Sequence, residues 1–215
     1  MEEYLTNYLQ QGIPEQQQWV IDLEKQAMEN KVPIMEPVSM NFLMQIIKIS
    51  KPKKTLEIGT AIGYSALRML EAYPETNITT IERDQQRYHQ AIENITAQTK
   101  NDHVNAVLGD ALEVLNDEFV KLHKSSFNLI FIDAAKGQYK RFFELVSPLL
   151  ANDGIIVSDN VLFRGYVANP ENAHPRHKQM VGKIRLYNEW LTNHPDFTTS
   201  IVPIGDGVAI SVKNS

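Results

Sequence analysis

The sequence predicts an α/β fold with a doubly wound, mostly parallel sheet, and three observations favour this class. From residue 54 onward, short apolar runs alternate with amphipathic segments of helical period. The stretch Lys54–Leu70 changes from strand-like to helix-like spacing across a turn bounded by Gly59 and Gly63. Near the end of the chain, Gly205-Asp206-Gly207 separates two strand-like runs, which predicts a hairpin and an antiparallel addition to the sheet.

Composition indicates a folded chain without a membrane span. The 215 residues are 43% hydrophobic, as in ordinary globular proteins, and no apolar run approaches the ~20 residues that a membrane span needs. The acidic beginning, Met1-Glu2-Glu3-Tyr4, is unlike a secretory signal, and the absence of Cys excludes disulfides and thiolate zinc sites. We expect a cytoplasmic protein with one domain over residues 1–215, of which residues 1–50 form a helical N-terminal extension.

The net charge of −5 does not favour nucleic-acid binding, but the charge is unevenly distributed. Residues 1–50 hold three Lys or Arg against seven Asp or Glu, whereas residues 136–185 hold eight Lys or Arg against four Asp or Glu. A basic second half suits an anionic partner, and a solvated mixed surface explains the charges equally well.

The N-terminal region has two helical patterns separated by prolines. Apolar spacing predicts helices over Gln16–Asn30 and Met40–Ile49. Between them, Val32–Pro37 contains two prolines, which disfavour a helix there. This segment either covers a bound cofactor or simply connects the helices, and the connector is the safer interpretation.

After the glycine turn, strands and helices alternate with short connections. The pattern predicts strands over Asn77–Ile81, Val104–Leu108, Phe127–Ile132, Gly154–Ser158, Phe197–Pro203 and Val208–Val212. It predicts helices over Asp84–Gln98, Ala111–Leu122, Tyr139–Leu150 and Lys178–Leu191. Strands that alternate with helices predict a parallel sheet with helices on both faces.

The turn itself is typical of a nucleotide-cofactor site. Its spacing, Glu57-x-Gly59-x-x-x-Gly63, is neither the G-x-G-x-x-G of dinucleotide binders nor a P-loop. A carboxylate two residues before the first glycine suits a ligand with an ammonium group, such as S-adenosylmethionine, and would repel a pyrophosphate. An NAD-dependent oxidoreductase is therefore disfavoured. Taken alone, this stretch could equally be an ordinary strand–helix turn with a solvated Glu57.

Acidic residues follow several of the predicted strands. Ligands bind outside the carboxyl ends of parallel strands, so these side chains are candidates for one site. Glu82 suits the two hydroxyls of a ribose, and Asp110 with the backbone of Ala111 suits an adenine edge. Asp133 ends the fourth strand and Asp159-Asn160 the fifth. A single acid at a strand end is more often a helix cap, but five along one sheet edge indicate a binding site.

Asp133, Asp159 and Asn160 offer two carboxylates and an amide oxygen, which fit Mg²⁺ or a similar hard cation better than zinc. Lys136 follows Asp133 by three residues, so it begins the next helix and faces the same cleft. Beside a metal it would act as a general base, although most lysines are surface residues. Intact metal and base positions disfavour a non-catalytic nucleotide-binding module.

These motifs resemble the cation-dependent, S-adenosylmethionine-using O-methyltransferases, which include catechol and caffeoyl-CoA enzymes. The likeness rests on Glu57-Ile-Gly59-Thr-Ala-Ile-Gly63-Tyr-Ser65, Glu82, Gly109-Asp110-Ala111, Asp133-Ala-Ala-Lys136-Gly137 and Asp159-Asn160-Val-Leu-Phe-Arg-Gly165, and covers about Val32 to Val212. It implies a Rossmann-like class I methyltransferase fold and a homodimer. It also implies a cofactor site of Met35, Glu57, Gly59, Ser65, Glu82, Asp110, Ala111 and Asp133, a metal held by Asp133, Asp159 and Asn160, and Lys136 as the base.

Within this family, the sequence is most similar to the branch that methylates the 5-hydroxyl of 5-hydroxyuridine at the wobble position of bacterial tRNA. This likeness implies that the product is 5-methoxyuridine. Basic residues after the metal motif suit the phosphates of an anticodon loop, namely Arg164, Arg176, His177, Lys178, Lys183 and Arg185. The alternative is a small-molecule O-methyltransferase acting on catechol-like or caffeoyl-CoA-like hydroxyls, because the same site would serve both acceptors.

Overall fold

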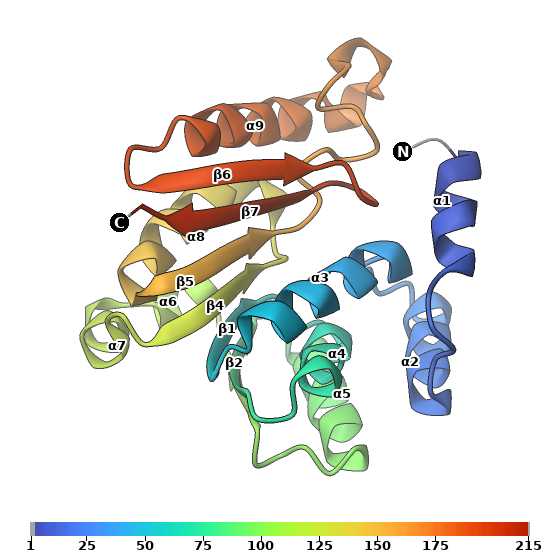
Figure 1. Ribbon diagram of the computed structural model, residues 1–215, viewed down its shortest axis with the longest axis vertical. Coiled ribbons are helices and arrows are strands. Elements are labelled where there is room, and N and C mark those ends of the chain that lie inside the picture. Colours follow the sequence, from blue (N-terminus) through green and yellow to red (C-terminus); the bar gives the residue numbers. More distant parts are fainter. Residues whose placement is uncertain (1–2, 215) are drawn as a thin grey trace.

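A single seven-stranded sheet organises residues 3–214, the part of the chain that this computed structural model describes. Met1 and Glu2, in the expected N-terminal extension, and Ser215 lie outside the described residues. The strands are β1 (Lys54–Ile58), β2 (Asn77–Glu82), β3 (Val104–Leu108), β4 (Phe127–Ile132), β5 (Leu150–Ser158), β6 (Phe197–Val202) and β7 (Val208–Lys213). Their order in the sheet is β3-β2-β1-β4-β5-β7-β6 (Figure 1).

The first five strands are parallel, and β7 pairs antiparallel with both β5 and β6. This arrangement confirms the predicted α/β class, its parallel sheet and its antiparallel C-terminal hairpin. The strand order reverses between β1 and β4, so a crevice forms at the carboxyl ends of these neighbours.

The helices follow the alternating pattern of the sequence. They are α1 (Glu3–Gln11), α2 (Gln18–Glu29), α3 (Pro37–Ser50), α4 (Tyr64–Ala72), α5 (Gln85–Ala97), α6 (Ala111–Val114), α7 (Asp117–His123), α8 (Tyr139–Val146) and α9 (Pro175–Thr192), with short 3-10 turns η1 (Lys136–Gln138), η2 (Ser147–Leu149) and η3 (Pro170–Asn172). In residues 3–214, no helix is long and apolar enough to cross a bilayer.

Several boundaries differ from the prediction, and four of these differences have identifiable reasons. Pro37 begins α3, because proline is well tolerated at the first helical position. The helix expected over 111–122 is two helices, because the side chain of Asn116 accepts hydrogen bonds from the next turn and starts α7. The helix from Tyr139 ends early at a 3-10 turn containing Pro148, and β5 starts at Leu150, earlier than expected.

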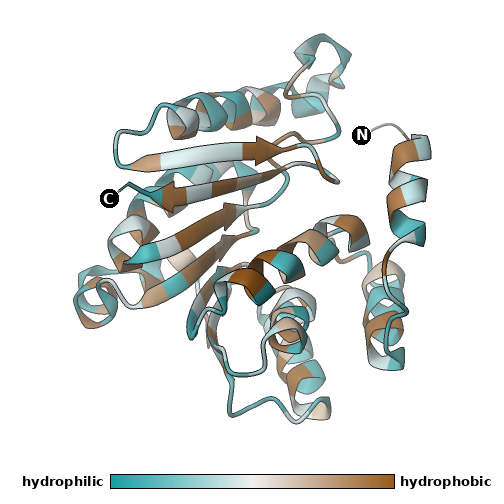
Figure 2. Cartoon of the chain, in the orientation of Figure 1, coloured by the Kyte–Doolittle hydropathy of each residue, from teal (hydrophilic) through white to brown (hydrophobic). Residues whose placement is uncertain are grey.

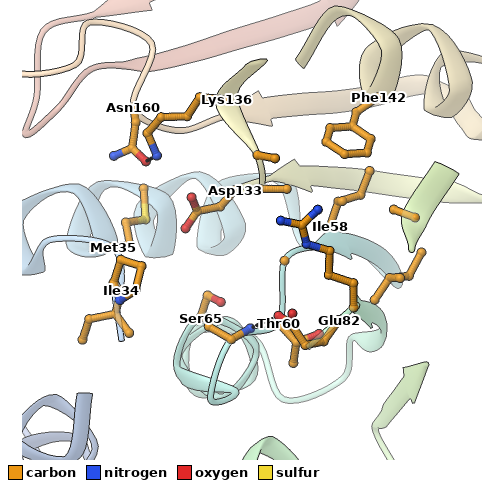
Figure 3. A pocket seen from close by; sticks show the side chains of 18 of the residues that line it. Ile34, Met35, Ile58, Thr60, Ser65, Glu82, Asp133, Lys136, Phe142 and Asn160 are labelled. Atoms are coloured by element: carbon orange, nitrogen blue, oxygen red, sulfur yellow. Dashed lines mark hydrogen bonds between the residues drawn. The ribbon is translucent and has the colours of Figure 1, made fainter. Parts of the chain in front are cut away.

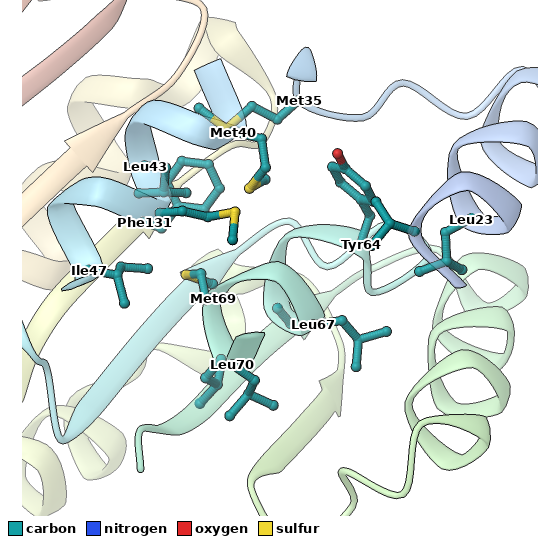
Figure 4. Close-up of a cluster of buried hydrophobic side chains, with 14 of the residues drawn as sticks. Leu23, Met35, Met40, Leu43, Ile47, Tyr64, Leu67, Met69, Leu70 and Phe131 are labelled. Atoms are coloured by element: carbon teal, nitrogen blue, oxygen red, sulfur yellow. The ribbon is translucent and has the colours of Figure 1, made fainter. Parts of the chain in front are cut away.

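Both faces of the central strands are covered by helices, so these strands are mostly apolar, with Glu57 of β1 as a buried exception (Figure 2). In β4, Leu129 and Phe131 pack in one core, and Ile130 and Ile132 in another. The first core contains side chains of α2, α3, α4 and α5, and Figure 4 shows Phe131 with residues of α3 and α4 around it. The second contains residues of α8 and α9. The two cores pack on opposite faces of the sheet whose strand ends form the crevice.

Candidate active site

A cavity of about 470 Å³ opens at the carboxyl ends of the parallel strands (Figure 3). Its volume is within the range of small-molecule sites. The walls come from the segment before α3, the β1–α4 turn, the ends of β2, β3 and β4, and the loop after β5. Among the expected site residues, those that line it are Met35, Gly59, Ser65, Glu82, Asp110, Ala111, Asp133, Lys136 and Asn160.

The glycine turn is built for close backbone approach. Gly59 has φ +102°, and a Cβ there would collide with the carbonyl oxygen of Asp133 at the end of β4. Gly63 has φ +83° and caps α4. The amide of Gly59 donates to the Ile81 carbonyl at 3.0 Å, so the ends of β1 and β2 are fastened together under the cavity. Only glycine combines this φ with this contact at position 59.

Glu57 lies behind the cavity and does not line it. Its side chain is fully buried and accepts hydrogen bonds from the Ser65 hydroxyl and, at 2.5 Å, from the Thr80 hydroxyl. Burial raises the pKa of Glu57 to about 7, although both hydroxyl donors lower it. Glu57 therefore reaches the cavity only through the hydroxyl of Ser65, which does line it, and its role toward a cofactor ammonium group stays a prediction.

The carboxylate of Glu82 is fixed by two backbone donors. Ala61 and Asp84 donate their amide hydrogens to its two oxygens at 2.8 and 2.9 Å. Asp110 accepts the amide hydrogen of Leu112 at 2.9 Å and caps α6, so it is both a helix cap and a cavity residue. The two acids mark the end of the cavity formed by β2 and β3.

The segment before α3 forms a wall of the cavity as well as a connection between helices. Pro33, Ile34, Met35 and Glu36 all line the cavity. The Tyr64 hydroxyl, on the opposite wall, donates to Glu24 of α2 at 2.8 Å. This hydrogen bond joins α2 to the first residue of α4. The segment before α3 therefore lines the cavity in addition to connecting α2 and α3.

The predicted metal ligands meet at the end of the cavity formed by β4 and β5. Asp133 and Asn160 line the cavity, and Asp159 is buried directly behind them with 1% exposure. The Oδ1 atom of Asp159 is buried and has no hydrogen-bond partner among the described residues. Burial raises the pKa of Asp133, and burial together with the neighbouring Asp133 carboxylate raises the pKa of Asp159 well above its ordinary value.

These residues fit a hard divalent cation chemically. Two carboxylates and an amide oxygen are its usual ligands, and the unpartnered oxygen of Asp159 has nothing else to bind. Within residues 3–214, no three His, Cys, Asp or Glu side chains gather into a metal cluster by themselves, so the site depends on Asn160. Lys136 Nζ donates to Asn160 Oδ1 at 2.6 Å, and Figure 3 shows this pair above Asp133.

Sequence reasoning missed several cavity residues. Glu36, Arg83, Arg87 and Asp206 line the cavity, but none follows a strand of the parallel sheet in a recognised motif, apart from Arg83 beside Glu82. Burial and the charge of Asp206 raise the pKa of Glu36, which places these two acids near each other. Asp206 was visible in the sequence only as part of a hairpin turn.

The expected basic residues divide into separate groups. Arg164 lines the cavity, whereas His177 and the other four lie on α9. At ~100° per residue, Arg176 and Lys183 flank one side of the buried stripe of α9, and Lys178 and Arg185 flank the other. Arg185 donates to the Val167 carbonyl at 3.1 Å. No ion pair in residues 3–214 involves any of the six.

Comparisons with known proteins show the family to which this chain is related. The O-methyltransferase family model matches residues 11–214. An Arabidopsis thaliana protein named as a caffeoyl-CoA O-methyltransferase is 34% identical over 184 residues, which is 85% of this chain and 77% of that protein. A Staphylococcus aureus crystal structure described as a caffeoyl-CoA O-methyltransferase has a TM-score of 0.85 at 35% identity, covering 99% of this chain and 98% of that one.

A more distant structure supports the fold alone. The SAH-bound Podospora anserina methyltransferase PaMTH1 has a TM-score of 0.86 at 21% identity, with 99% of this chain and 95% of that chain covered.

Proposed function

We propose which acceptor and which metal this chain uses. The chain belongs to the O-methyltransferase family and is an S-adenosylmethionine-dependent O-methyltransferase. The acceptor is a planar ring with a hydroxyl beside a second oxygen, as in a catechol. Asp133, Asp159 and Asn160 hold a divalent cation such as Mg²⁺ at the acceptor end of the cavity. The observation that carries the proposal is the buried, unpartnered oxygen of Asp159 beside Asp133 and Asn160.

The remaining cavity residues suit the methyl donor. Glu82 is positioned by two backbone amides to accept ribose hydroxyls, and Asp110 with Ala111 is available for the adenine. Met35, Ser65 and Asp133 surround the other end, where the amino-acid part and the sulfonium would lie. Glu57 acts there through Ser65. When bound, S-adenosylmethionine supplies an electrophilic methyl group on a positively charged sulfur.

The chain's own residues then orient the acceptor and remove the proton of its hydroxyl. A bound cation supplies Lewis acidity that lowers the pKa of an acceptor hydroxyl. Lys136 takes the hydroxyl proton at Nζ, which lies at the cavity wall beside Asn160. Fixed walls of backbone and buried side chains align the acceptor oxygen with the methyl group, and such alignment contributes up to ~7–11 kcal/mol to catalysis.

Methyl transfer from labelled S-adenosylmethionine tests the proposal. The acceptors are a simple catechol, caffeoyl-CoA and tRNA carrying 5-hydroxyuridine, each with Mg²⁺ and with chelator. We expect chelator-sensitive labelling, and Lys136→Ala should lower kcat by about 10²–10⁴, the usual contribution of a general base. Lys140→Ala is the matched control, because Lys140 is exposed on α8 and pairs with Glu144. Full activity in chelator would remove the metal from the proposal.

A small catechol-like or caffeoyl-CoA-like acceptor is the first candidate. Caffeoyl-CoA is the substrate named for the two relatives at 34% and 35% identity. Phe163, on the loop that also carries Asn160, lines the cavity and offers a ring on which an aromatic acceptor can pack. The comparisons do not point to a tRNA acceptor.

The 5-hydroxyuridine of a tRNA wobble position is the second candidate. Its 5-hydroxyl lies beside the 4-oxo oxygen, so it presents the same pair of oxygens as a catechol. The specific observation in its favour is the unpaired charge of Arg164 at the cavity and of Arg176 and Lys183 along one side of α9. Labelling of tRNA that falls steeply with salt would support it, and labelling of the catechol alone would overturn it.

A homodimer is part of the same proposal. Tyr4 and Tyr8 on α1 are 74% and 71% exposed, an apolar surface that a second copy would cover. A molar mass of about twice 24.5 kDa by light scattering would agree, and a monomer at all concentrations would contradict it.

A further inference from the structure

The backbone amides of the loop after Asn160 donate hydrogen bonds to a hairpin more than forty residues away in sequence. Three successive backbone amides, of Leu162, Phe163 and Arg164, all donate to one residue, Asp206. The first two reach its carbonyl oxygen at 2.8 and 3.0 Å, and the third reaches its side-chain Oδ1 at 3.0 Å. The amide of Val161 donates to the next residue, Gly207, at 3.0 Å.

This loop has an unfavourable backbone that needs such support. Asn160, Phe163 and Arg164 have φ of 55°, 38° and 56°, in the left-handed region that residues with a Cβ rarely adopt. Strained residues of this kind persist only where their surroundings fix them. The four hydrogen bonds from the hairpin tip are the surroundings that do so here.

The hairpin tip, Gly205-Asp206-Gly207, packs tightly against α3 and the loop. A Cβ on Gly207 would collide with the Leu162 side chain, and one on Gly205 would collide with the Ser39 hydroxyl of α3. Both glycines have positive φ. The tip is therefore seated between α3 and the loop, and it cannot move without moving the loop.

We propose that Asp206 is a positioning residue that fixes the loop carrying Asn160 and Phe163 at the acceptor end of the cavity. It lines the cavity together with both of them, but its hydrogen bonds go to the loop backbone. By holding this backbone it sets where the Asn160 amide oxygen meets Lys136 and where the Phe163 ring forms a wall. The consequences for metal and acceptor rest on the proposed function, whereas the fixing of the loop does not.

Two substitutions separate the hydrogen bond from the charge. Asp206→Asn keeps a side-chain oxygen that can accept from the Arg164 amide and removes the charge. Asp206→Ala removes both, while the backbone carbonyl bonds can remain in either variant. Asp196→Ala is the matched control, because Asp196 is an exposed acid just before β6.

Amide hydrogen exchange reads the loop directly. In Asp206→Ala, exchange at Arg164 and its neighbours should become about three- to tenfold faster, the effect of losing one hydrogen bond. In Asp206→Asn and Asp196→Ala it should stay within about twofold of the unmodified protein. Unchanged exchange in Asp206→Ala, or an equal increase in Asp206→Asn, would overturn the proposal.

Binding gives a second readout. Mn²⁺ affinity, measured by electron paramagnetic resonance, should fall about three- to tenfold further in Asp206→Ala than in Asp206→Asn, because both variants lose the negative charge that acts on Asp159 and only Asp206→Ala also loses the hydrogen bond. The affinity for S-adenosylhomocysteine should not change, because the loop amides that Asp206 holds belong to Leu162, Phe163 and Arg164, none of which is proposed for that ligand. If no Mn²⁺ binds to any of the proteins, the proposed metal fails and the exchange data still decide the role of Asp206.

Discussion

Replacing Glu57 by glutamine tests the energetic effect of a carboxyl buried behind the glycine turn. Burial raises the pKa of Glu57 from its ordinary 4.5 to about 7 in the folded protein. The folded chain therefore keeps a proton between these two pH values that the unfolded chain releases. The stabilising contribution is fully present below pH 4.5 and is lost as pH rises through 7. The loss is (7 − 4.5) pH units times ~1.4 kcal/mol, or roughly 3 kcal/mol.

Urea unfolding at several pH values measures this contribution. Glutamine does not ionise, so the variant should gain stability relative to the unmodified protein by roughly 3 kcal/mol between pH 4.5 and pH 8.5. All other titrating groups are common to both proteins and largely cancel in the difference. Glu29→Gln is the control, since its side chain is 61% exposed and its replacement should give a flat difference. A flat difference for Glu57→Gln as well would refute the reasoning.

Three further substitutions test other parts of the site. Gly59→Ala should cost about 2–5 kcal/mol in urea unfolding, because φ +102° is strained for alanine and its Cβ would meet the Asp133 carbonyl; a cost below about 1 kcal/mol would contradict this. Tyr64→Phe should cost about 1 kcal/mol by losing the hydrogen bond to Glu24, and an unchanged stability would show that this bond contributes nothing. Asp159→Asn should raise the melting temperature in chelator, because it removes a buried ionisable carboxyl beside Asp133, and should reduce stabilisation by Mg²⁺; an equal Mg²⁺ response in both proteins would exclude Asp159 as a ligand.

The position of the site was predictable from the sequence because the fold fixes it. Alternating strands and helices predict a parallel sheet, and the carboxyl ends of parallel strands share one edge. Glu82, Asp110, Asp133 and Asn160 were assigned to that edge, and all four line the cavity. Asp110 also shows that one side chain can cap a helix and line a binding site, since it caps α6 and lines the cavity.

The depth of each side chain was not predictable in the same way. Glu57 and Asp159 lie at strand ends like the others, yet they are buried behind the cavity, because successive residues there point in different directions. Asp206 could not be found at all, since its role depends on where a distant hairpin packs. The tRNA acceptor came from resemblance alone, and the structure contributes only unpaired basic residues to that question.

The three buried acids of the site should link ligand binding to the release of protons. Glu57, Asp133 and Asp159 all have pKa values raised by burial, to about 7 for Glu57, so the protein without ligands holds on to protons more strongly than free carboxyls do. The methyl donor carries positive charge on its sulfur and ammonium group, and the proposed metal is a divalent cation. Each cation favours the ionised acids, so its binding should release protons, and its affinity should rise with pH between about 5 and 8. Titration calorimetry in two buffers of different ionisation enthalpy counts these protons. Proton uptake on binding, or an affinity that falls over this range, would mean that the acids do not face the bound charge.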